Sequence, residues 1–160
     1  MGTNEVRAAL EALSYPVTVV SVGRGGVENA LTVSWLSQVS FEPPMVVFAL
    51  DKKHYSEELL RSTKTFVVNV LGQGQEKLAG HFARQAMAGE DKLDATPTRE
   101  ANGGARILTE AIAWLDCEVE AIHPVGDHLL VVGRVHDGAV QSEGLGLSSA
   151  SGIRYRTAKV

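Results

Sequence analysis

Two long alternating stretches, separated by a very short turn, constrain the fold of this chain more than any other feature. Apolar and polar residues alternate from Ala111 to Ile122, which is the period of a strand with one buried and one exposed face. Gly126 and Asp127 have the chemistry of a turn, and a second long strand is expected from His128 to Val135. Because strands joined by so short a connection pair antiparallel, the sequence predicts an antiparallel hairpin here.

The first of these strands also predicts which side chains are buried. Its two faces carry different residues: Leu115, Cys117, Val119 and Ala121 on one side, and Asp116, Glu118 and Glu120 on the other. Cys117 is the one cysteine of the chain, so no intrachain disulfide can form. Its place in the alternating run indicates a buried structural thiol rather than a nucleophile.

A second informative stretch runs from residue 29 to residue 44, where a strand-like sequence carries an unusual number of hydroxyl groups. Thr32 and Ser34 lie two apart, so in a strand their side chains project from the same face. Together with the amide of Gln38, such a row suits a phosphorylated, hydrogen-bonding ligand laid along the strand and the turn after it. The alternative is a half-exposed strand whose outer face is simply polar. Pro43 and Pro44 end the stretch, since neither can donate to a strand ladder.

A basic segment lies directly before a predicted helix over residues 57–63. Ser56 is placed to cap this helix, and two acidic residues lie in its first turn. Residues 52–54, two lysines and a histidine, equip the helix start to hold a phosphate. A solvated basic loop that leads into an ordinary helix is the alternative.

These stretches belong to an ordered set of blocks that resembles the flavin reductase-like family of FMN-binding split barrels. The blocks are residues 29–34, 38–44, 45–50, 66–71, 75–79 and 126–128. They follow one another in the family's order from about Pro16 to about Gly138, which is most of the chain. The resemblance implies a mainly β fold, an antiparallel split β-barrel of Greek-key type with a few short helices, in a single domain over residues 1–160.

The resemblance also implies which residues bind the flavin. In the family a basic residue and a hydroxyl of the segment before the helix face the flavin phosphate. Lys53 and Ser56 match these positions best, and Lys52 and His54 are rivals. The other cofactor-binding positions that it implies are Asn29, Ala30, Leu31, Thr32, Val33, Ser34, Ser37, Gln38, Val39, Ser40, Tyr55 and Asn69.

His128 admits two interpretations. A histidine at the junction of a turn and a strand is most often a surface or capping residue. In the resembling reductases, however, Gly-Asp-His lies close to the flavin and the nicotinamide, which makes His128 the candidate catalytic residue. Its role would be positioning or proton supply, because imidazole changes charge near neutral pH.

The function implied by the resemblance is reduction of FMN, or of loosely held FAD, by NAD(P)H. The protein would be a homodimer with the flavin at the interface, and it could supply a monooxygenase component with reduced flavin. Two rivals share the barrel: a non-enzymatic FMN electron carrier, and an oxidoreductase that uses a deazaflavin. A binding module without redox chemistry is a more distant class.

Composition excludes several other classes. The 160 residues suit one domain, and 44% hydrophobic with 21% charged residues is ordinary for a globular protein. A net charge of −4 argues against a general nucleic-acid or acidic-membrane surface. Neither an apolar leader nor a membrane-length apolar run is present, so we expect a cytoplasmic protein. The histidines lack metal-binding spacing, and no metal is expected.

The remaining segments predict short elements and loops. Thr3 or Asn4 is placed to cap a short helix with Val6, Leu10 and Leu13 on one face. Residues 23–26 form a glycine-rich hairpin turn, and residues 75–83 form a helix packed through Leu71, Leu78 and Phe82. Gly72 and Gly74, just before this helix, are not a dinucleotide-binding fingerprint, because Lys77 stands where the third glycine of that motif belongs. Residues 86–105 read as a surface loop or lid. In the resembling family an apolar strand usually precedes a Tyr-Arg pair like the one in residues 153–156, and the small, polar residues 148–152 depart from that pattern.

Overall fold

A computed structural model describes residues 2–85 and 90–151 of the chain, so residues 153–156 lie outside the described part. Seven strands form one antiparallel sheet in the order β2-β1-β5-β8-β9-β4-β3. They are β1 (Thr18–Arg24), β2 (Val27–Val33), β3 (Leu36–Ser40), β4 (Met45–Asp51), β5 (Thr65–Val70), β8 (Ala113–Val125) and β9 (His128–Val140). The other elements are β6 (Thr98–Glu100), β7 (Arg106–Leu108), α1 (Thr3–Glu11), α2 (Ser56–Thr63), α3 (Glu76–Ala83) and a 3-10 turn (Ser149–Ser151). The expected mainly β, antiparallel fold is confirmed.

Both predicted hairpins are present. Val125 pairs with His128 across the short turn between β8 and β9. Between β1 and β2, Gly25 and Gly26 have φ of +67° and +86°, which the tight turns of two-residue hairpins require and which glycine adopts without strain. The local sequence therefore determines the register of two of the strand pairs.

The connection through α2 makes the topology a Greek key. After the hairpins β1–β2 and β3–β4, the chain crosses by α2 and returns as β5 beside β1. The sheet curls around one core cluster that takes residues from β2 near one edge and from β4 near the other. Phe48 and Phe66 meet edge to face in this core, with 5.2 Å between ring centroids.

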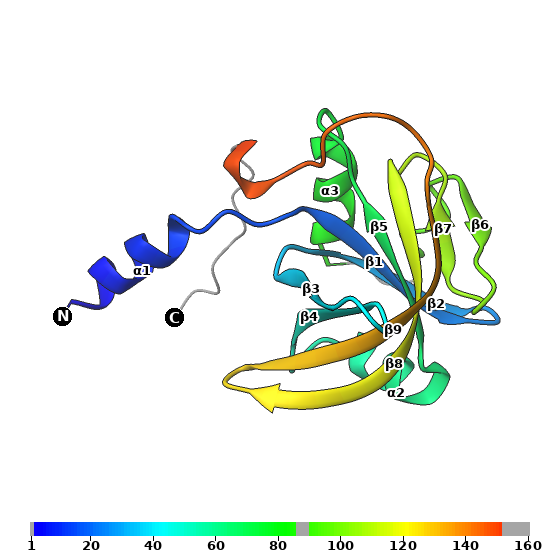
Figure 1. Ribbon diagram of the computed structural model, residues 1–160, viewed down its shortest axis with the longest axis horizontal. Coiled ribbons are helices and arrows are strands. Elements are labelled where there is room, and N and C mark those ends of the chain that lie inside the picture. The colour runs from blue at the N-terminus through cyan, green and yellow to red at the C-terminus, as the bar shows by residue number, and fades with distance from the viewer. Residues whose placement is uncertain (1, 86–89, 152–160) are drawn as a thin grey trace.

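Residues 86–105 were expected to form a loop or lid. Residues 90–97 are turns, as a loop would be, but the chain after them contains strands. Residues 98–108 form the β6–β7 ribbon, which covers the outer face of β5 and β8 (Figure 1). Ala101, Ala105 and Ile107 are buried there against Trp114. Small apolar residues in a mostly polar stretch gave too weak a periodicity to be recognised as strands.

The ribbon also buries part of the face of β8 that was expected to be exposed. Asp116, expected on the exposed side, is only 4% exposed, and its Oδ2 accepts a hydrogen bond from Gly103 N at 3.0 Å. Cys117 is buried as predicted, and burial raises the pKa of its thiol to about 12. A bulge between Val119 and Ala121 places Ile122, rather than Ala121, on the core cluster.

Helix α1 stands away from the barrel (Figure 1). It begins at Thr3 with Gly2 in the N-cap position, so the cap lies one residue before Thr3, the first of the two predicted cap residues. None of its residues is buried, and Val6 and Leu10 are 42% and 56% exposed. Within residues 2–85 and 90–151, no helix has the length and apolarity that crossing a membrane requires.

Candidate functional site

A buried hydrogen bond joins the two segments that the sequence marks as ligand-binding. Asn29 Nδ2 on β2 donates to Ser56 Oγ at 2.9 Å, and the two residues are 6% and 0% exposed. Ser56 was expected to cap α2 but is its first residue, because Tyr55 already has helical dihedral angles (φ −67°, ψ −13°). The Ser56 hydroxyl is therefore directed to β2 and brings the start of α2 against this strand.

His54, two residues before α2 begins, accepts the hydrogen bond from the helix start that a capping serine was expected to accept. Its Nδ1 accepts a hydrogen bond from Ser56 N at 3.2 Å. Burial lowers the pKa of His54, the positive charge of Lys92 lowers it further, and Asp51 partly opposes the shift. A neutral imidazole that accepts a hydrogen bond does not supply a cation, so His54 is a poor rival for the phosphate contact.

The two lysines upstream of α2 differ in whether their side-chain ammonium groups have a hydrogen-bond partner. Lys52 Nζ donates to Gly126 O at 2.7 Å and so ties this loop to the β8–β9 turn. Lys53 uses its backbone N–H for Asp51 Oδ1 at 2.8 Å, while its ammonium has no hydrogen bond or ion pair with any described residue. Of the two, Lys53 is the cation available to an anionic ligand.

The backbone N–H groups at the start of α2 are already used. Glu57 N donates to His54 O at 3.3 Å and Glu58 N donates to Tyr55 O at 3.2 Å. The Tyr55 ring stacks on the His54 ring at 5.7 Å and is 58% exposed. A phosphate at this helix start would therefore depend on side chains more than on free backbone donors.

The hydroxyl row of β2 and β3 is only partly free. Thr32 Oγ1 donates to Ala79 O of α3 at 2.6 Å. Ser37 Oγ donates to Gln38 O at 2.9 Å, and the Gln38 amide donates to Ser40 O at 3.1 Å, at exposed positions. Ser34 differs from these residues: its Oγ is buried and has no hydrogen-bond partner in the described structure. This oxygen is the clearest unmet polar group of the stretch.

The apolar members of the predicted set can offer only main-chain groups. Ala30, Leu31 and Val33 are buried in the cores on either side of β2. Val39 lies at the bulge of edge strand β3 and is 53% exposed. Any contact of the three buried residues with a flavin must run through backbone N–H and C=O groups.

The side chain of Asn69, one of the predicted cofactor-binding residues, is fully engaged within the fold. Its Nδ2 donates to Val19 O at 3.0 Å and to Ser21 Oγ at 3.4 Å, and its Oδ1 accepts from Leu108 N at 2.8 Å. Asn69 is fully buried, and both of its amide N–H groups are used. It holds β5, β1 and β7 together, and we leave it out of the candidate site.

His128 begins β9 and is held on two sides. Its Nδ1 lies 2.6 Å from Asp127 Oδ1, and its ring centroid lies 4.9 Å from that of Trp35. The hydrogen bond and charge of His128 lower the pKa of the Asp127 carboxyl. Among residues 2–85 and 90–151, none makes a hydrogen bond to His128 Nε2, and the side chain is 24% exposed. The second ring nitrogen is therefore available to a ligand.

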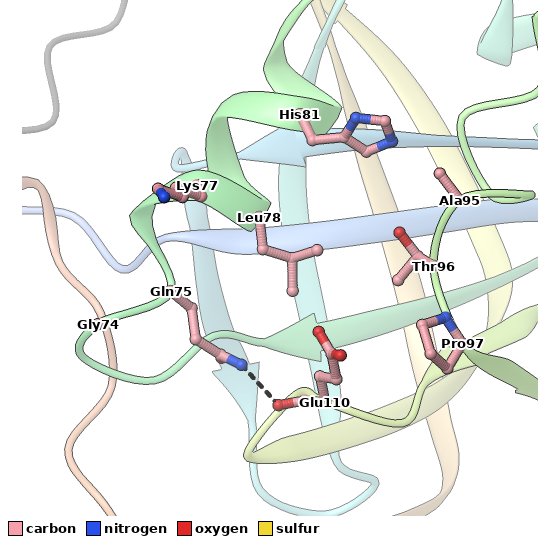
Figure 2. Close-up of a pocket in the computed structure, with 9 residues that line it drawn as sticks. All are labelled: Gly74, Gln75, Lys77, Leu78, His81, Ala95, Thr96, Pro97 and Glu110. Carbon is pink, nitrogen blue, oxygen red and sulfur yellow. Dashed lines mark hydrogen bonds between the residues drawn. The ribbon is translucent and has the colours of Figure 1, made fainter.

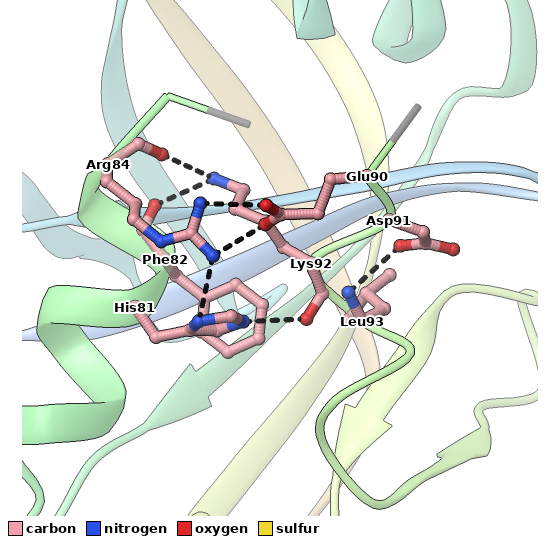
Figure 3. A network of polar contacts seen from close by, with 7 residues as sticks. All are labelled: His81, Phe82, Arg84, Glu90, Asp91, Lys92 and Leu93. Carbon is pink, nitrogen blue, oxygen red and sulfur yellow. Dashed lines mark hydrogen bonds and ion pairs between the residues drawn. The ribbon is translucent and has the colours of Figure 1, made fainter. Parts of the chain in front are cut away.

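Lys92 is a residue that the sequence analysis missed. It is 6% exposed, and its Nζ donates to Phe82 O and Arg84 O, both at 3.0 Å, at the C-terminal end of α3 (Figure 3). Burial lowers the pKa of Lys92, with a further decrease from Arg84 and an opposing effect of Glu90. A lone lysine in a polar stretch carries no sequence signal for this capping role.

The comparison with protein families agrees with this geometry. The model of the family described as flavin reductase like domain matches residues 10–155. The chain belongs to the flavin reductase-like family. The expectation from the sequence blocks is thereby confirmed.

Similar proteins include both longer proteins and solved structures. Diflavin flavoprotein A 1 of Synechocystis sp. is 33% identical over 144 residues, which cover 89% of this chain and 25% of that protein. This flavin reductase-like chain therefore spans about a quarter of the length of the curated relatives it matches. The structure of the NADH:FAD oxidoreductase SgcE6 of Streptomyces globisporus C-1027 has a TM-score of 0.83 and 30% identity, over 91% of this chain and 87% of that one. Flavin reductase PheA2 has a TM-score of 0.80 and 27% identity, over 92% and 93%.

The residues of this flavin reductase-like domain fit a phosphorylated flavin. Leaving a buried hydroxyl without a partner costs about 1–3 kcal/mol, and a ligand with polar ring atoms would offset that cost at Ser34. Lys53 supplies an unpaired cation at the start of α2, and the Asn29–Ser56 bond joins that helix start to β2. Across the described residues there is no group of three or more metal-ligating side chains.

A cleft of about 390 Å³ lies elsewhere, between α3 and residues 95–97 (Figure 2). Lys77, His81 and Glu110 are among its lining residues, and the Gln75 amide donates to Glu110 O at 2.7 Å across its floor. None of the flavin positions implied by the resemblance lines it. The candidate site of the flavin reductase-like domain is therefore not this cleft.

Proposed function

We propose that this flavin reductase-like domain uses NAD(P)H to reduce flavin, FMN in the first place and FAD as the alternative. The observation that carries the proposal is that an unmet hydroxyl directly follows β2 and an unmet cation lies just before α2, the two elements that the Asn29–Ser56 bond joins. Within residues 2–85 and 90–151, Ser34 Oγ is buried without a partner, and Lys53 Nζ is an exposed cation without one. A ligand that has a polar ring system and a phosphate satisfies both.

Each of the candidate site residues then has a definite role. Lys53 pairs with the phosphate, and Ser34 with the exposed amide of Gln38 hydrogen-bonds the ring system. His128, held by Asp127, faces the nicotinamide through its free Nε2 and positions it or supplies a proton. A bound flavin would supply the hydride acceptor for the reduced nicotinamide. The protein supplies orientation and electrostatics for that transfer.

The similar proteins support the electron donor and leave the flavin open. SgcE6 is named an NADH:FAD oxidoreductase, and one of its structures contains NAD and FAD fragments. PheA2 is named a flavin reductase. As the partner class that would consume reduced flavin from this chain, we further propose a monooxygenase component.

A second candidate function has its own supporting observation. The curated relatives are diflavin flavoproteins in which a segment like this chain is about a quarter of the length. In that setting the domain would pass electrons to another flavin within one larger protein. Such a carrier holds FMN tightly, whereas a reductase that serves a separate monooxygenase releases it.

We also propose that the domain is a homodimer. On β8, β9 and β4 the outer face presents five apolar side chains in register: Ala121, Leu130, Val132, Val47 and Ala49. Helix α3 and the β6–β7 ribbon cover the outer face of the other half of the sheet, whereas no described element covers this half. Phe41, just after β3, is 88% exposed. A second copy would bury this face and Phe41 together.

The test is a titration followed by a turnover assay. Purified protein should quench flavin fluorescence on binding FMN, and it should then oxidise NADH or NADPH, seen as loss of nicotinamide absorbance. Binding of FMN without nicotinamide oxidation would favour the electron carrier. If FMN gives neither fluorescence quenching nor thermal stabilisation at millimolar concentration, the proposed function is wrong. Light scattering on the same sample measures whether the mass is that of a dimer.

A further inference from the structure

The cleft between α3 and residues 95–97 has polar lining groups that the rest of the fold does not use (Figure 2). Its volume is about 390 Å³, and none of the positions assigned to the flavin lines it. Sites for small molecules usually have volumes of about 300–1,000 Å³. The cleft therefore has room for a small molecule, and its lining groups define which kind.

Thr96 carries the clearest of these groups. The residue is 9% exposed, and its Oγ1 forms no hydrogen bond with any residue in the ranges 2–85 and 90–151. Figure 2 shows this hydroxyl on the cleft side of residues 95–97, directed toward α3. Because a hydroxyl this deeply buried normally has a hydrogen-bond partner, its orientation into open space points to a ligand.

The start of α3 forms a positive end of the cleft. Gln75 is the N-cap residue, but its side chain does not cap the helix: its Oε1 accepts from Gly72 N at 2.8 Å and its amide donates to Glu110 O at 2.7 Å. The backbone N–H groups of residues 76–78 therefore have no acceptor in the described part of the chain, unlike those at the start of α2. Unused N–H groups at a helix start attract anions, and the exposed ammonium of Lys77 adds a full positive charge.

Glu110 forms a negative end next to this positive one. Figure 2 shows its carboxylate directed into the cleft, and the carboxylate has no hydrogen bond or ion pair with the residues that the structure describes. The backbone O of the same residue is held 2.7 Å from the Gln75 amide, at the N-cap of α3. The two charged ends are therefore neighbours within one cleft.

Both walls of the cleft are held in place by hydrogen bonds. His81 Nε2 lies 2.8 Å from Lys92 O, which ties α3 to the segment that leads to residues 95–97. Pro97 O accepts from Thr109 N at 3.1 Å and from Thr109 Oγ1 at 3.2 Å. A cleft that is formed in advance binds a ligand with little loss of conformational freedom.

We propose that this cleft is a binding site for a free α-amino acid. The carboxylate of the ligand lies at the start of α3 beside Lys77, and its ammonium faces Glu110. Thr96 Oγ1, which can donate or accept, hydrogen-bonds one of these two groups, and the half-buried Leu78 contacts the ligand side chain.

The close spacing of the two charged ends favours this ligand class over its alternatives. An α-amino acid carries its carboxylate and its ammonium on one carbon, which matches ends that the Gln75–Glu110 bond holds side by side. A simple anion would face the like charge of Glu110, and a simple amine would face Lys77 and the helix start. This site goes beyond flavin reduction and does not depend on it.

The test is a calorimetric titration of the whole chain with the natural L-amino acids, at least one of which should bind. The amino acid that binds most tightly is then compared with the amine that lacks its carboxylate and the acid that lacks its ammonium. For L-leucine these analogues are isoamylamine and isocaproate. Each analogue should bind at least about tenfold more weakly, because each loses one charge-assisted contact.

Variants of the two charged ends locate the ligand. Glu110→Gln keeps the backbone O that Gln75 contacts, and it should weaken the amino acid about tenfold or more. It should not weaken the acid analogue, which has no ammonium to lose. Lys77→Gln should cost about two- to fivefold, since Lys77 is exposed and the helix N–H groups remain. Glu100→Gln, at an exposed position on β6 outside the cleft, is the control and should leave the affinity unchanged.

Thr96→Val separates a binding role from a structural one. Valine has the shape of threonine without the hydroxyl, so the variant should weaken the amino acid. Because that hydroxyl has no partner in the ligand-free fold, its removal should leave the urea midpoint of the free protein unchanged or raised. A lower midpoint with unchanged affinity would make Thr96 a structural residue and contradict the proposal.

Three other results would overturn the proposal. The first is that no natural L-amino acid gives heat or a rise in melting temperature at millimolar concentration. The second is an acid analogue that binds as tightly as its amino acid, which would make the cleft a site for simple anions. The third is unchanged affinity in Glu110→Gln, which would place the ligand elsewhere. A failed FMN titration bears on the proposed function alone.

Discussion

Asn29 and Ser56, 27 positions apart in the sequence, are joined by a 2.9 Å hydrogen bond between two buried side chains. The bond fastens the start of α2 to β2, and therefore fixes the loop that carries Lys53 relative to the strand that leads to Ser34. Since neither side chain is accessible, we assign the pair to building the site rather than to touching a ligand.

A double-mutant cycle on this pair should show coupling. Asn29→Ala and Ser56→Ala each leave a buried partner unsatisfied, so each should lower the free energy of unfolding by about 1–3 kcal/mol. The double variant should lose less than the sum of the two, by about 1 kcal/mol, because the same bond is removed twice. Urea unfolding of the four proteins measures this. Additive losses would show that the bond contributes nothing of its own.

Lys53→Ala should weaken FMN binding without affecting the fold. The ammonium has no partner in the described part of the chain, and a charge-assisted hydrogen bond to a phosphate contributes about 1.5–3 kcal/mol. Riboflavin, which lacks the phosphate, should lose much less. Fluorescence titration with both ligands gives the two affinities.

Lys52→Ala is the matched control for this substitution. Lys52 Nζ is bound to Gly126 O, so its removal should disturb the β8–β9 turn more than the phosphate contact. Equal losses of FMN and riboflavin affinity in Lys53→Ala would move the phosphate contact to another residue. A selective loss of FMN in Lys52→Ala would identify that residue.

His54 should make the stability of the apoprotein depend on pH. Its pKa is lowered in the folded state by burial and by Lys92, while in the unfolded chain it is about 6.5. Above that value both states are neutral, and no difference arises. As the pH falls below about 6.5 the unfolded chain binds a proton that the folded chain does not, so stability decreases.

His54→Asn tests this dependence, because an amide oxygen can accept the Ser56 N–H without titrating. The urea midpoint of the wild type should fall more between pH 7 and pH 5 than that of His54→Asn. Parallel pH profiles would mean that the folded and unfolded chains protonate His54 to the same extent. In that case it would return as a rival for the phosphate.

Much of this fold could be predicted from local sequence patterns. The β8–β9 and β1–β2 hairpins follow from alternation and turn residues, and helix α3 from its apolar spacing. The β6–β7 ribbon could not be predicted, since its short strands are stabilised by burial on Trp114 rather than by their own pattern. Asp116 was misplaced for the same reason, because alternation does not reveal what will cover a polar face.

The site was harder to predict than the fold. Which of several lysines and hydroxyls is free depends on partners distant in sequence, as with Lys52 and Gly126 or Thr32 and Ala79. The exposure of Trp35 likewise depends on Tyr15 and on the β8–β9 turn, which no local pattern contains.

His128→Ala should lower the rate of flavin reduction while leaving FMN affinity nearly unchanged. The imidazole is fixed by Asp127 at 2.6 Å and by the Trp35 ring at 4.9 Å, and its Nε2 is free. Loss of transition-state positioning appears as a fall in turnover, and loss of a nicotinamide contact as a rise in KM. Stopped-flow reduction of flavin-loaded protein by NAD(P)H separates the two. His123→Ala, an exposed histidine on the same hairpin, is the control and should behave as the wild type. A histidine that only supports the fold would instead lower the melting temperature of His128→Ala and leave both kinetic constants intact, and that result would remove His128 from the site.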